Sequence, residues 1–506
     1  MDVLTSMGKM IVLDLGAEYK PMYLKFESFY GQPFIFCMLH NYGGVQGLFG
    51  AVDSLLKNLI AARAYPNVSM VGTGLTPEGI NQNYVMYDLM NEQAWRTGPL
   101  NITTWSDNYA QRRYGSDEPR LATAWGILMR SVYNCTANIR FHGRHVITRR
   151  PNMHLKLLEW YSISDVLTAW DLMVEVANER YNDRVHPSVD VHHNTIVVPE
   201  PMQEGHTTAV AEQPTFQHDL VDVTRQVLQI LGGHMIINIQ TAFRNKVELA
   251  VEVLGLLLED LLEDLDTLLG SSPDFLLGAW MDQAQQWATN EKERELYLYN
   301  ALNQITLWGP DGEIHDYAIK QWNGVVGGYL KPRWTLFVSH LLASLREDRP
   351  YNQTAFESEV FTLVEDPFSR ATNASYPSAA QGDAVSLVLA LHEKYRNVFR
   401  MEAFMKLHRP QESASWWENE DLFLNDVESF VSLKEKAKEN LEMATLQNLQ
   451  DPEILTVVGD QNEEEDLDQE QEDQPLRRML QEDDDDLTME DVYQFLSYLP
   501  PPRRLT

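Results

Sequence analysis

A glutamate between a proline and a glycine is the residue of this chain best placed to do chemistry. Residues 72–80 read GTGLTPEGI and follow a short apolar run. Glycines let the backbone turn and Pro77 stiffens the loop, so the carboxylate of Glu78 would be presented beyond the end of a strand. There it would serve as a nucleophile or a general acid. The alternative is that Glu78, next to Pro77, is a first-turn acid of the following helix.

A second polar stretch, LHNYGG at residues 39–44, directly follows an apolar run. Its two glycines let the backbone approach a ligand, and His40, Asn41 and Tyr42 offer hydrogen-bonding and stacking groups suited to a sugar. The alternative is that the glycines only serve a turn and that His40 is a buried histidine with its hydrogen bonds satisfied. This stretch indicates a binding site only if it lies close to Glu78.

A third candidate is the turn TLWGPDG at residues 306–312, followed by Ile314 and Tyr317. Because sugar faces stack on aromatic planes, Trp308 and Tyr317 could form the wall of a carbohydrate pocket. The alternative is a core tryptophan that caps a loop.

The sequence lacks the motifs of several other enzyme classes. The sequence holds no phosphate-binding G-x-x-x-x-G-K-[ST], no serine-hydrolase G-x-S-x-G and no H-E-x-x-H. Four histidines between 186 and 206 have no acidic ligands at helical spacing, so we expect neither a metal nor a cofactor. Cys37 and Cys135 allow at most one disulfide.

The elements that must position these residues fall into two kinds. Apolar runs at 10–15, 33–39 and 69–72 predict buried parallel strands, each followed by a polar or glycine-rich stretch. In parallel α/β folds the loops at the carboxyl ends of strands carry the chemistry. Three strand-helix units cannot close an eight-stranded barrel, so residues 1–98 are expected to be part of a larger (β/α)8 barrel.

From residue 99 to about 410, apolar spacing of three and four predicts an all-α domain. Its clearest helix runs from Val247 to a stop at Gly270, and others are expected at 118–133, 215–231, 279–304, 334–346 and 382–400. Residues 182–214 interrupt the pattern and predict a surface insertion. Residues 411–506 are predicted to be a largely disordered acidic tail. Between 460 and 491 the sequence has sixteen acidic residues and only two basic ones, Arg477 and Arg478.

Composition narrows the function further. The 506 residues are 44% hydrophobic, as in folded proteins, and carry a formal charge of -34, which disfavours binding to nucleic acid. We find no membrane span and no secretory signal in the sequence. Five glycosylation acceptors would matter only on the secretory route, at Asn67, Asn101, Asn134, Asn352 and Asn373.

Many separate motifs resemble the alpha-N-acetylglucosaminidase family, glycoside hydrolase family 89. They occur in order over about residues 8–400 and leave out the acidic tail. They are IVLDL at 11–15, GQPFIFCMLHN at 31–41, MVGTG at 70–74, PEGI at 77–80, RSVYNC at 130–135, RRP at 149–151, FLLG at 275–278, LWGP at 307–310 and PRW at 332–334.

The resemblance implies a fold and an activity. Members of the family place a (β/α)8 barrel against an all-α C-terminal domain and release terminal α-linked N-acetylglucosamine from heparan sulfate in the lysosome, with retention of configuration. It implies that Glu78 is the nucleophile, that the chain self-associates, and that the pocket is formed by Leu39, Tyr42, His142, Trp308, Ile314 and Tyr317.

A retaining mechanism needs a second acid, roughly 5 Å from the nucleophile. In the family this glutamate lies on an earlier barrel strand, for which we find no counterpart in the sequence, and Asp14 and Glu18 are weak local substitutes. Two hypotheses therefore stand. The chain is a glycosidase truncated at its N-terminus and inactive alone, or it is a catalytically inactive binding or scaffold protein.

Overall fold

The computed structural model describes residues 10–398, except 42, 44–46, 80–82, 97, 137–144, 186–187, 191–194 and 198–209. Two residues expected in the pocket, Tyr42 and His142, lie outside the described residues. The expected acidic tail, 411–506, lies outside them as well.

The first part of the chain forms a three-stranded parallel sheet in the order β1 (Val12–Asp14), β2 (Phe34–Met38) and β3 (Met70–Leu75). Asp14 pairs in register with Phe36, and Phe36 with Thr73. These are the three strands that the apolar runs predict. Strand β3 continues three residues beyond the expected end at 72, so Gly74 belongs to the strand and lies beside Cys37.

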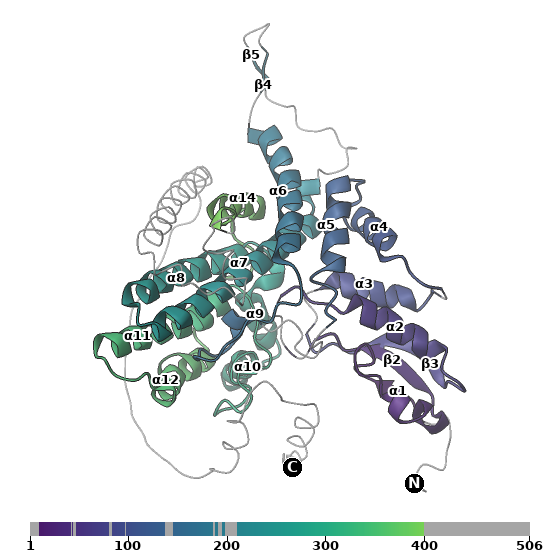
Figure 1. Cartoon of the computed structure of the whole chain (residues 1–506), viewed down its shortest axis with the longest axis horizontal. Helices are drawn as coiled ribbons and strands as arrows, with labels where there is room; N and C mark the ends of the chain where they lie inside the picture. Colours follow the sequence, from purple (N-terminus) through teal and green to yellow (C-terminus); the bar gives the residue numbers. More distant parts are fainter. Residues whose placement is uncertain are drawn as a thin grey trace. The chain divides into compact units, whose positions relative to one another are not determined.

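Helices follow each strand and cover the sheet (Figure 1). They are α1 (Met22–Lys25), the 3-10 turn η1 (Ser28–Gly31), α2 (Val52–Arg63) and α3 (Tyr84–Gln93). The carboxylate of Asp14 accepts hydrogen bonds from the backbone nitrogens of Met22 and Tyr23, both at 3.0 Å, and so caps the start of α1. The central strand β2 is the most buried of the three, with Phe34, Phe36, Cys37 and Met38 inside the core.

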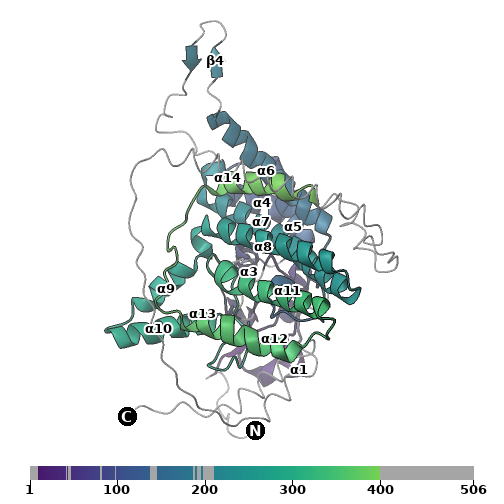
Figure 2. The ribbon, with the colours of Figure 1, turned by 90° about the vertical axis from the view of Figure 1, so that its left-hand side faces the viewer.

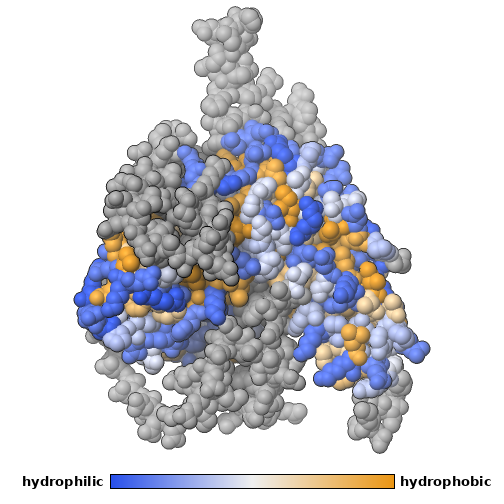
Figure 3. Space-filling model, in the orientation of Figure 1, coloured by the Kyte–Doolittle hydropathy of each residue, from blue (hydrophilic) through white to orange (hydrophobic). Residues whose placement is uncertain are grey.

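The sheet leaves apolar side chains at the surface. Leu13 and Val71 on the two outer strands are 51% and 62% exposed, and Ile11 just before β1 is 57% exposed. Figure 3 shows hydrophobic patches on the right of the view, where the sheet and its helices lie. Among the described residues, β1 and β3 each pair with β2 alone, which leaves both edges of the sheet open.

The rest of the described chain is almost entirely helical. Its α-helices are α4 (Ile102–Tyr114), α5 (Pro119–Arg130), α6 (Ile163–Val185), α7 (Pro214–Arg244), α8 (Glu248–Gly270), α9 (Leu277–Gln285), α10 (Glu291–Gln304), α11 (Lys331–Arg346), α12 (Gln353–Val360), α13 (Asp366–Arg370) and α14 (Ala384–Tyr395). Shorter helical turns are η3 (Val146–Thr148), η4 (Val210–Glu212), η5 (Pro273–Phe275), η6 (Val326–Leu330) and η7 (Phe361–Glu365). A two-stranded antiparallel pair, β4 (Ser188–Asp190) and β5 (Thr195–Val197), follows α6 within the expected insertion.

Helix α7 forms the centre of this helical part. It packs against α6, α8 and α14, and Figure 2 shows α14, α7, α8 and α11 stacked in layers. The helix is buried on nearly every side, which is why its polar residues are buried too. The helix extends to Arg244, well past the expected end at 231, because tertiary packing supports turns that carry glycine and polar residues.

The expected helix at 279–304 is instead two helices. Asn290 caps the second of them by accepting a hydrogen bond from the backbone nitrogen of Glu293 at 3.0 Å. An N-cap residue has extended backbone geometry, so the chain breaks there and starts again as α10. The apolar spacing alone does not reveal this break.

The loop after β2 joins the sheet to the helices. The backbone nitrogen of Leu48 donates to Oε1 of Gln226 on α7 at 2.8 Å. Next to it, the backbone nitrogen of Cys135 donates to the carbonyl of Gly50 at 2.7 Å. The carboxyl end of the sheet is therefore hydrogen-bonded to the helical part, which allows both to contribute residues to one site.

Candidate active site

Glu78 lies in the loop that follows β3, and its side chain is exposed. Helix α3 begins only at Tyr84, so Glu78 is not a first-turn acid of that helix. The phenolic hydroxyl of Tyr317 donates a hydrogen bond to Oε2 of Glu78 at 2.5 Å. Two residues singled out in separate motifs therefore meet across the junction between sheet and helices.

Trp308 stands next to this pair. Its ring contacts that of Tyr317 edge-on, with centroids 5.2 Å apart and an angle of 69°. Trp308 is only partly buried and has a left-handed backbone, with φ 52°. Asn303 fixes the turn, since its side chain bonds both the nitrogen and the carbonyl of Gly309, at 2.7 and 2.8 Å. The tryptophan is thus held on a hydrogen-bonded turn beside Tyr317 and is only partly buried.

Ile314 precedes Tyr317 in the same turn and is also partly buried. Its carbonyl accepts a hydrogen bond from the backbone nitrogen of Tyr317 at 3.3 Å. Leu39, by contrast, is 5% exposed, and its carbonyl accepts from the nitrogen of Asn41 at 2.7 Å. Leu39 therefore offers a pocket little surface.

The loop after β2 holds the glutamate loop in place. The side chain of Asn41 accepts from the nitrogen of Gly79 at 2.9 Å and donates to its carbonyl at 2.8 Å. The hydroxyl of Tyr87 on α3 donates to the same carbonyl at 3.0 Å. Both backbone groups of Gly79 are thereby satisfied, which fixes the peptide that follows Glu78.

Gly43 adds a steric constraint. Its φ is +67°, and a Cβ there would lie 2.8 Å from the ring of Tyr317. Glycine alone satisfies both the left-handed backbone and this close approach. The glycine of the second motif therefore gives Tyr317 its place beside Glu78.

His40 and Glu18 are buried behind the site. The backbone nitrogen of His40 donates to Oε1 of Glu18 at 2.7 Å. Burial raises the pKa of Glu18 to about 7 and lowers the pKa of His40 to about 3. The His40 ring packs against Phe49 and Tyr87. His40 is therefore a buried residue that packs behind the site.

Asp14 and Glu18 do not present a second acid. Asp14 is 2% exposed and caps α1, and Glu18 is 3% exposed and holds the backbone of His40. Within the described residues, neither carboxylate shares a hydrogen-bond partner with Glu78. Within the part of the chain that the structure describes, the side chain of Glu78 is hydrogen-bonded to Tyr317 and not to a second carboxylic acid.

Lys320 is a residue that the motifs do not reveal. Its side chain is 7% exposed, and Nζ donates to the carbonyl of Gly43 at 2.5 Å. Burial lowers the pKa of Lys320 to about 8, while the charge of Glu78 acts in the opposite direction. Lys320 lies three positions after Tyr317 in the sequence. Its place at the site becomes visible only from its hydrogen bond to the loop after β2.

A buried ionic network supports the turn from behind. Nη1 of Arg333 on α11 donates to both carboxylate oxygens of Asp316 at 2.9 Å, and Glu365 lies on its other side at 3.3 Å. Arg150 adds a second cation, 2.8 Å from Glu365. Burial raises the pKa of Glu365, but the hydrogen bond with His315 and the charges of Arg333 and Arg150 lower it to about 2. Asp316 directly precedes Tyr317, so this network fixes the backbone that carries the hydroxyl.

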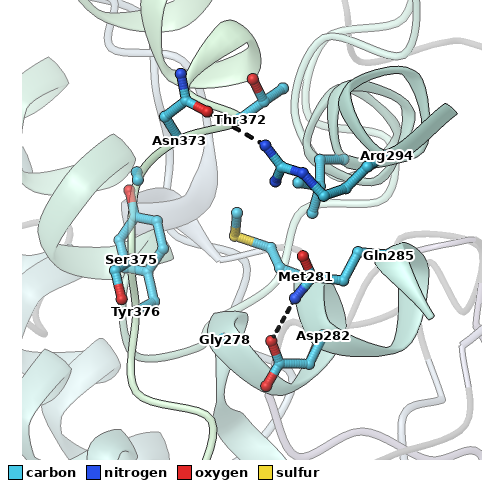
Figure 4. Close-up of a pocket in the computed structure, with 11 residues that line it drawn as sticks. Gly278, Met281, Asp282, Gln285, Arg294, Thr372, Asn373, Ser375 and Tyr376 are labelled. Atoms are coloured by element: carbon cyan, nitrogen blue, oxygen red, sulfur yellow. Dashed lines mark hydrogen bonds between the residues drawn. The ribbon is translucent and has the colours of Figure 1, made fainter. Parts of the chain in front are cut away.

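A separate cavity of about 260 Å³ lies between α9, α10 and the segment after α13 (Figure 4). Arg294 and Asn373 face each other across it, 3.4 Å apart, and the walls carry Met281, Asp282, Gln285 and Tyr376. None of the residues around Glu78 lines this cavity. It is therefore distinct from the site just described.

The five glycosylation acceptors differ in accessibility. Asn67, Asn101, Asn352 and Asn373 are exposed. Asn134 is partly buried, and its amide nitrogen donates to the carboxylate of Asp53 at 2.9 Å. A glycan at Asn134 would replace one of the two hydrogens of this amide nitrogen.

Two further findings concern the described residues as a set. Across the described parts of 10–398, no three His, Cys, Asp or Glu side chains come together as a metal-binding group. No helix in that part of the chain is long and apolar enough to cross a membrane. Cys37 and Cys135 are both buried and are not joined by a disulfide.

Comparison with known proteins agrees with the motif resemblance. Two family models match: the alpha-N-acetylglucosaminidase (NAGLU) tim-barrel domain over residues 2–97 and the C-terminal domain of the same family over 105–197 and 199–394. Human alpha-N-acetylglucosaminidase is 41% identical over 392 residues, which are 77% of this chain and 48% of the human protein. The chain thus spans about half the length of this relative.

Solved structures show the same fold. A Clostridium perfringens family 89 glycoside hydrolase, with two glutamates changed to glutamine and its substrate GlcNAc-alpha-1,4-galactose bound, matches with a TM-score of 0.64 and 23% identity. The match covers 78% of this chain and 43% of that one. The Clostridium perfringens enzyme in complex with PUGNAc gives a TM-score of 0.63 at 23% identity, over 77% and 42% of the two chains.

These matches establish the architecture expected from the sequence, part of a TIM barrel followed by an all-α domain. The C-terminal family model alone covers more than half of the 506 residues. The chain belongs to the alpha-N-acetylglucosaminidase family.

Proposed function

We propose that this chain carries the nucleophile half of a retaining exo-glycosidase that releases terminal α-linked N-acetylglucosamine from heparan sulfate. Membership of the family supports glycosidase chemistry and a glycan substrate. The observation that carries the proposal is the hydrogen bond between Tyr317 and Glu78, with Trp308 beside it. It joins a carboxylate to the aromatic wall that a sugar ring requires.

In this proposal Glu78 attacks the anomeric carbon and forms a glycosyl-enzyme while the glycosidic oxygen leaves. Tyr317 orients the attacking carboxylate. Trp308 and Ile314 bound the sugar, with Leu39, Tyr42 and His142 as the further pocket residues implied by the family. A second carboxyl group protonates the leaving oxygen and later activates water.

The proposal places this second carboxyl group in the part of the family barrel that these 506 residues do not match. The human relative is about twice as long as the matched region, and an eight-stranded barrel contains more than the three strands seen here. The chain by itself then holds a nucleophile without its acid and base. Family membership also supports a lysosomal glycoprotein, with glycans at Asn67, Asn101, Asn134, Asn352 and Asn373.

The test uses two substrates that differ in their leaving group. Phenyl α-N-acetylglucosaminide, an aryl glycoside with a poor leaving group, needs a proton on its leaving oxygen, so the purified chain should not hydrolyse it. N-acetyl-α-glucosaminyl fluoride needs none, because fluoride leaves with the electron pair of the carbon–fluorine bond. We expect fluoride release, abolished in Glu78→Gln and unchanged in Glu175→Gln, an exposed glutamate on α6.

Folding of each variant would be checked by circular dichroism. No fluoride release from the folded wild-type chain would contradict the nucleophile assignment. Turnover of the aryl glycoside that is lost in Glu78→Gln would show instead that a second acid is present in the chain. A chain that binds N-acetylglucosamine without reacting with the fluoride would favour the alternative, an inactive binding protein.

A further inference from the structure

We propose that Lys320 is a positioning residue of this site, whose ammonium group anchors the loop of Gly43 and stabilises Glu78 as a carboxylate when it departs from the glycosyl-enzyme. The inference rests on the proposed role of Glu78 as the nucleophile. It gives a function to a buried cation that neither the motifs nor the mechanism above requires.

The contacts of Lys320 lie on both loops of the site. Nζ donates to the carbonyl of Gly43 at 2.5 Å. The same nitrogen would be 3.4 Å from a Cβ at Gly79, as would the carbonyl of Gly43. Lys320 therefore lies between the loop after β2 and the loop after β3, next to the peptide that follows Glu78.

The charge of Lys320 needs an explanation, because burying a cation without an acidic partner is costly. Among the salt bridges of the described residues, none includes Lys320, and the charge that acts on its ammonium group is that of Glu78. The ring of Trp322 lies 5.8 Å from Nζ and offers a weak further stabilisation.

Lys394 shows how a structural lysine in the same fold differs. It is also 7% exposed, but its ammonium group lies 2.8 Å from Asp260 and 2.5 Å from Asp264 on α8. These two acids raise the pKa of Lys394, whereas burial lowers that of Lys320. Lys394 forms ion pairs with neighbouring acids on α8, whereas the acid whose charge acts on Lys320 is the proposed nucleophile Glu78.

The two chemical steps respond to this charge in opposite ways. In the first step a Glu78 oxygen bonds to the anomeric carbon and the carbon–oxygen bond to the leaving group breaks, so negative charge on Glu78 is consumed. In the second step a nucleophile bonds to that carbon, the bond to Glu78 breaks, and its electron pair returns to the carboxylate. A nearby cation favours the second step and does not assist the first.

Azide makes both steps measurable in this chain, because the azide anion needs no base for activation. With N-acetyl-α-glucosaminyl fluoride and saturating azide, fluoride release reports the first step, and formation of the α-glycosyl azide reports the second. Lys320→Met removes both charge and donor, and Lys320→Gln removes the charge but keeps an N–H for the carbonyl of Gly43. Lys320→Arg keeps both.

We expect Lys320→Met and Lys320→Gln to slow breakdown of the glycosyl-enzyme about tenfold, as expected for the loss of an opposite charge nearby. Fluoride release in the initial burst should not slow, so the adduct accumulates. Lys320→Arg should restore breakdown to near the wild-type rate, and Lys394→Met should change neither step.

Equal slowing of both steps in Lys320→Gln, or unchanged breakdown in it, would overturn the role of the charge. The Gln variant guards against the case in which Lys320→Met does not fold. If the wild-type chain forms no adduct at all, the nucleophile assignment itself fails, which is a different result from a wild-type adduct that is insensitive to Lys320.

Discussion

The hydroxyl of Tyr317 lies 2.5 Å from a carboxylate oxygen of Glu78, although the two residues are 239 positions apart in the chain. One comes from the loop after the last described strand of the sheet and the other from a turn of the helical domain. A site built in this way depends on the junction between the two parts. Changes at that junction should affect reactivity as strongly as changes in the carboxylate's own loop.

Removing the hydroxyl tests this relationship directly. We expect Tyr317→Phe to slow fluoride release from N-acetyl-α-glucosaminyl fluoride by about 10- to 100-fold, because the carboxylate is no longer held in the geometry for attack. Its stability should change little, since the ring still packs on Trp308 and Gly43. Tyr299→Phe on α10 is the matched control. A rate within twofold of the wild type would show that the hydroxyl does not orient Glu78.

Gly43 should be required for the position of Tyr317. In Gly43→Ala the new methyl group would lie 2.8 Å from the tyrosine ring, and the ring must move. Gly115→Ala is a close control because it has a similar backbone, φ +58°, but no atoms within 4 Å of the added Cβ. Both variants should lose about 1 kcal/mol of stability from backbone strain. Only Gly43→Ala should also lose reactivity with the fluoride, and equal activity in the two would contradict the steric argument.

Glu18 should make the protein more stable in acid than at neutral pH. Burial raises its pKa from the usual 4.5 to about 7, so the folded state binds this proton more tightly than the unfolded state. The free energy of unfolding should therefore rise as the pH falls from about 7 toward 4.5, by about 3 kcal/mol from this group. Above pH 7 the carboxylate is charged in both states and its burial is a cost.

Glu18→Gln imitates the protonated acid and keeps an oxygen for the nitrogen of His40. Urea unfolding of both proteins between pH 4.5 and 8 would measure the difference. The variant should be the more stable protein at pH 8, and the two should converge near pH 4.5. The opposing effect of buried His40, whose pKa is lowered, is common to both and cancels. Parallel curves would contradict the assignment.

Arg333 should be essential to the fold behind the site. It is completely buried between Asp316 and Glu365, so Arg333→Met would leave the buried Glu365 and the partly buried Asp316 without this partner. We expect a loss of about 3 to 5 kcal/mol, seen as a large decrease in Tm. Arg370→Met is the control, because Arg370 forms its ion pair at the surface and should contribute less than about 1 kcal/mol. Similar decreases in both variants would rule out a special role for the buried network.

Local patterns predicted the elements well where one pattern dominated. The three apolar runs became β1, β2 and β3, and the leucine spacing of 247–270 became α8. The break at Asn290 and the length of α7 were not predicted, because a single cap and tertiary packing decide them. Helix α6 was also not predicted, although its buried residues Ile163, Val166, Trp170, Met173 and Ala177 follow the same spacing of three and four.

The site was predictable only in part. The spacing around Glu78 and Trp308 indicated chemistry, but their association came from family resemblance, because no local pattern links residues so far apart. Lys320 could not be found in this way, since it stands in an unremarkable IKQ segment and gains its role from the carbonyl of Gly43. Tyr42 and His142 remain predictions, because they lie outside the described residues.

The central claim is that Glu78 forms the covalent bond to the sugar. The most direct measurement is peptide mass spectrometry of the wild-type chain after reaction with N-acetyl-α-glucosaminyl fluoride in the absence of azide. Because the proposed mechanism assigns this chain no base to activate water, the adduct should persist and add one N-acetylglucosaminyl group to the peptide that contains residues 72–80, with fragment ions assigning it to Glu78. A sugar found on another residue, or a folded chain that stays unmodified, would contradict the account.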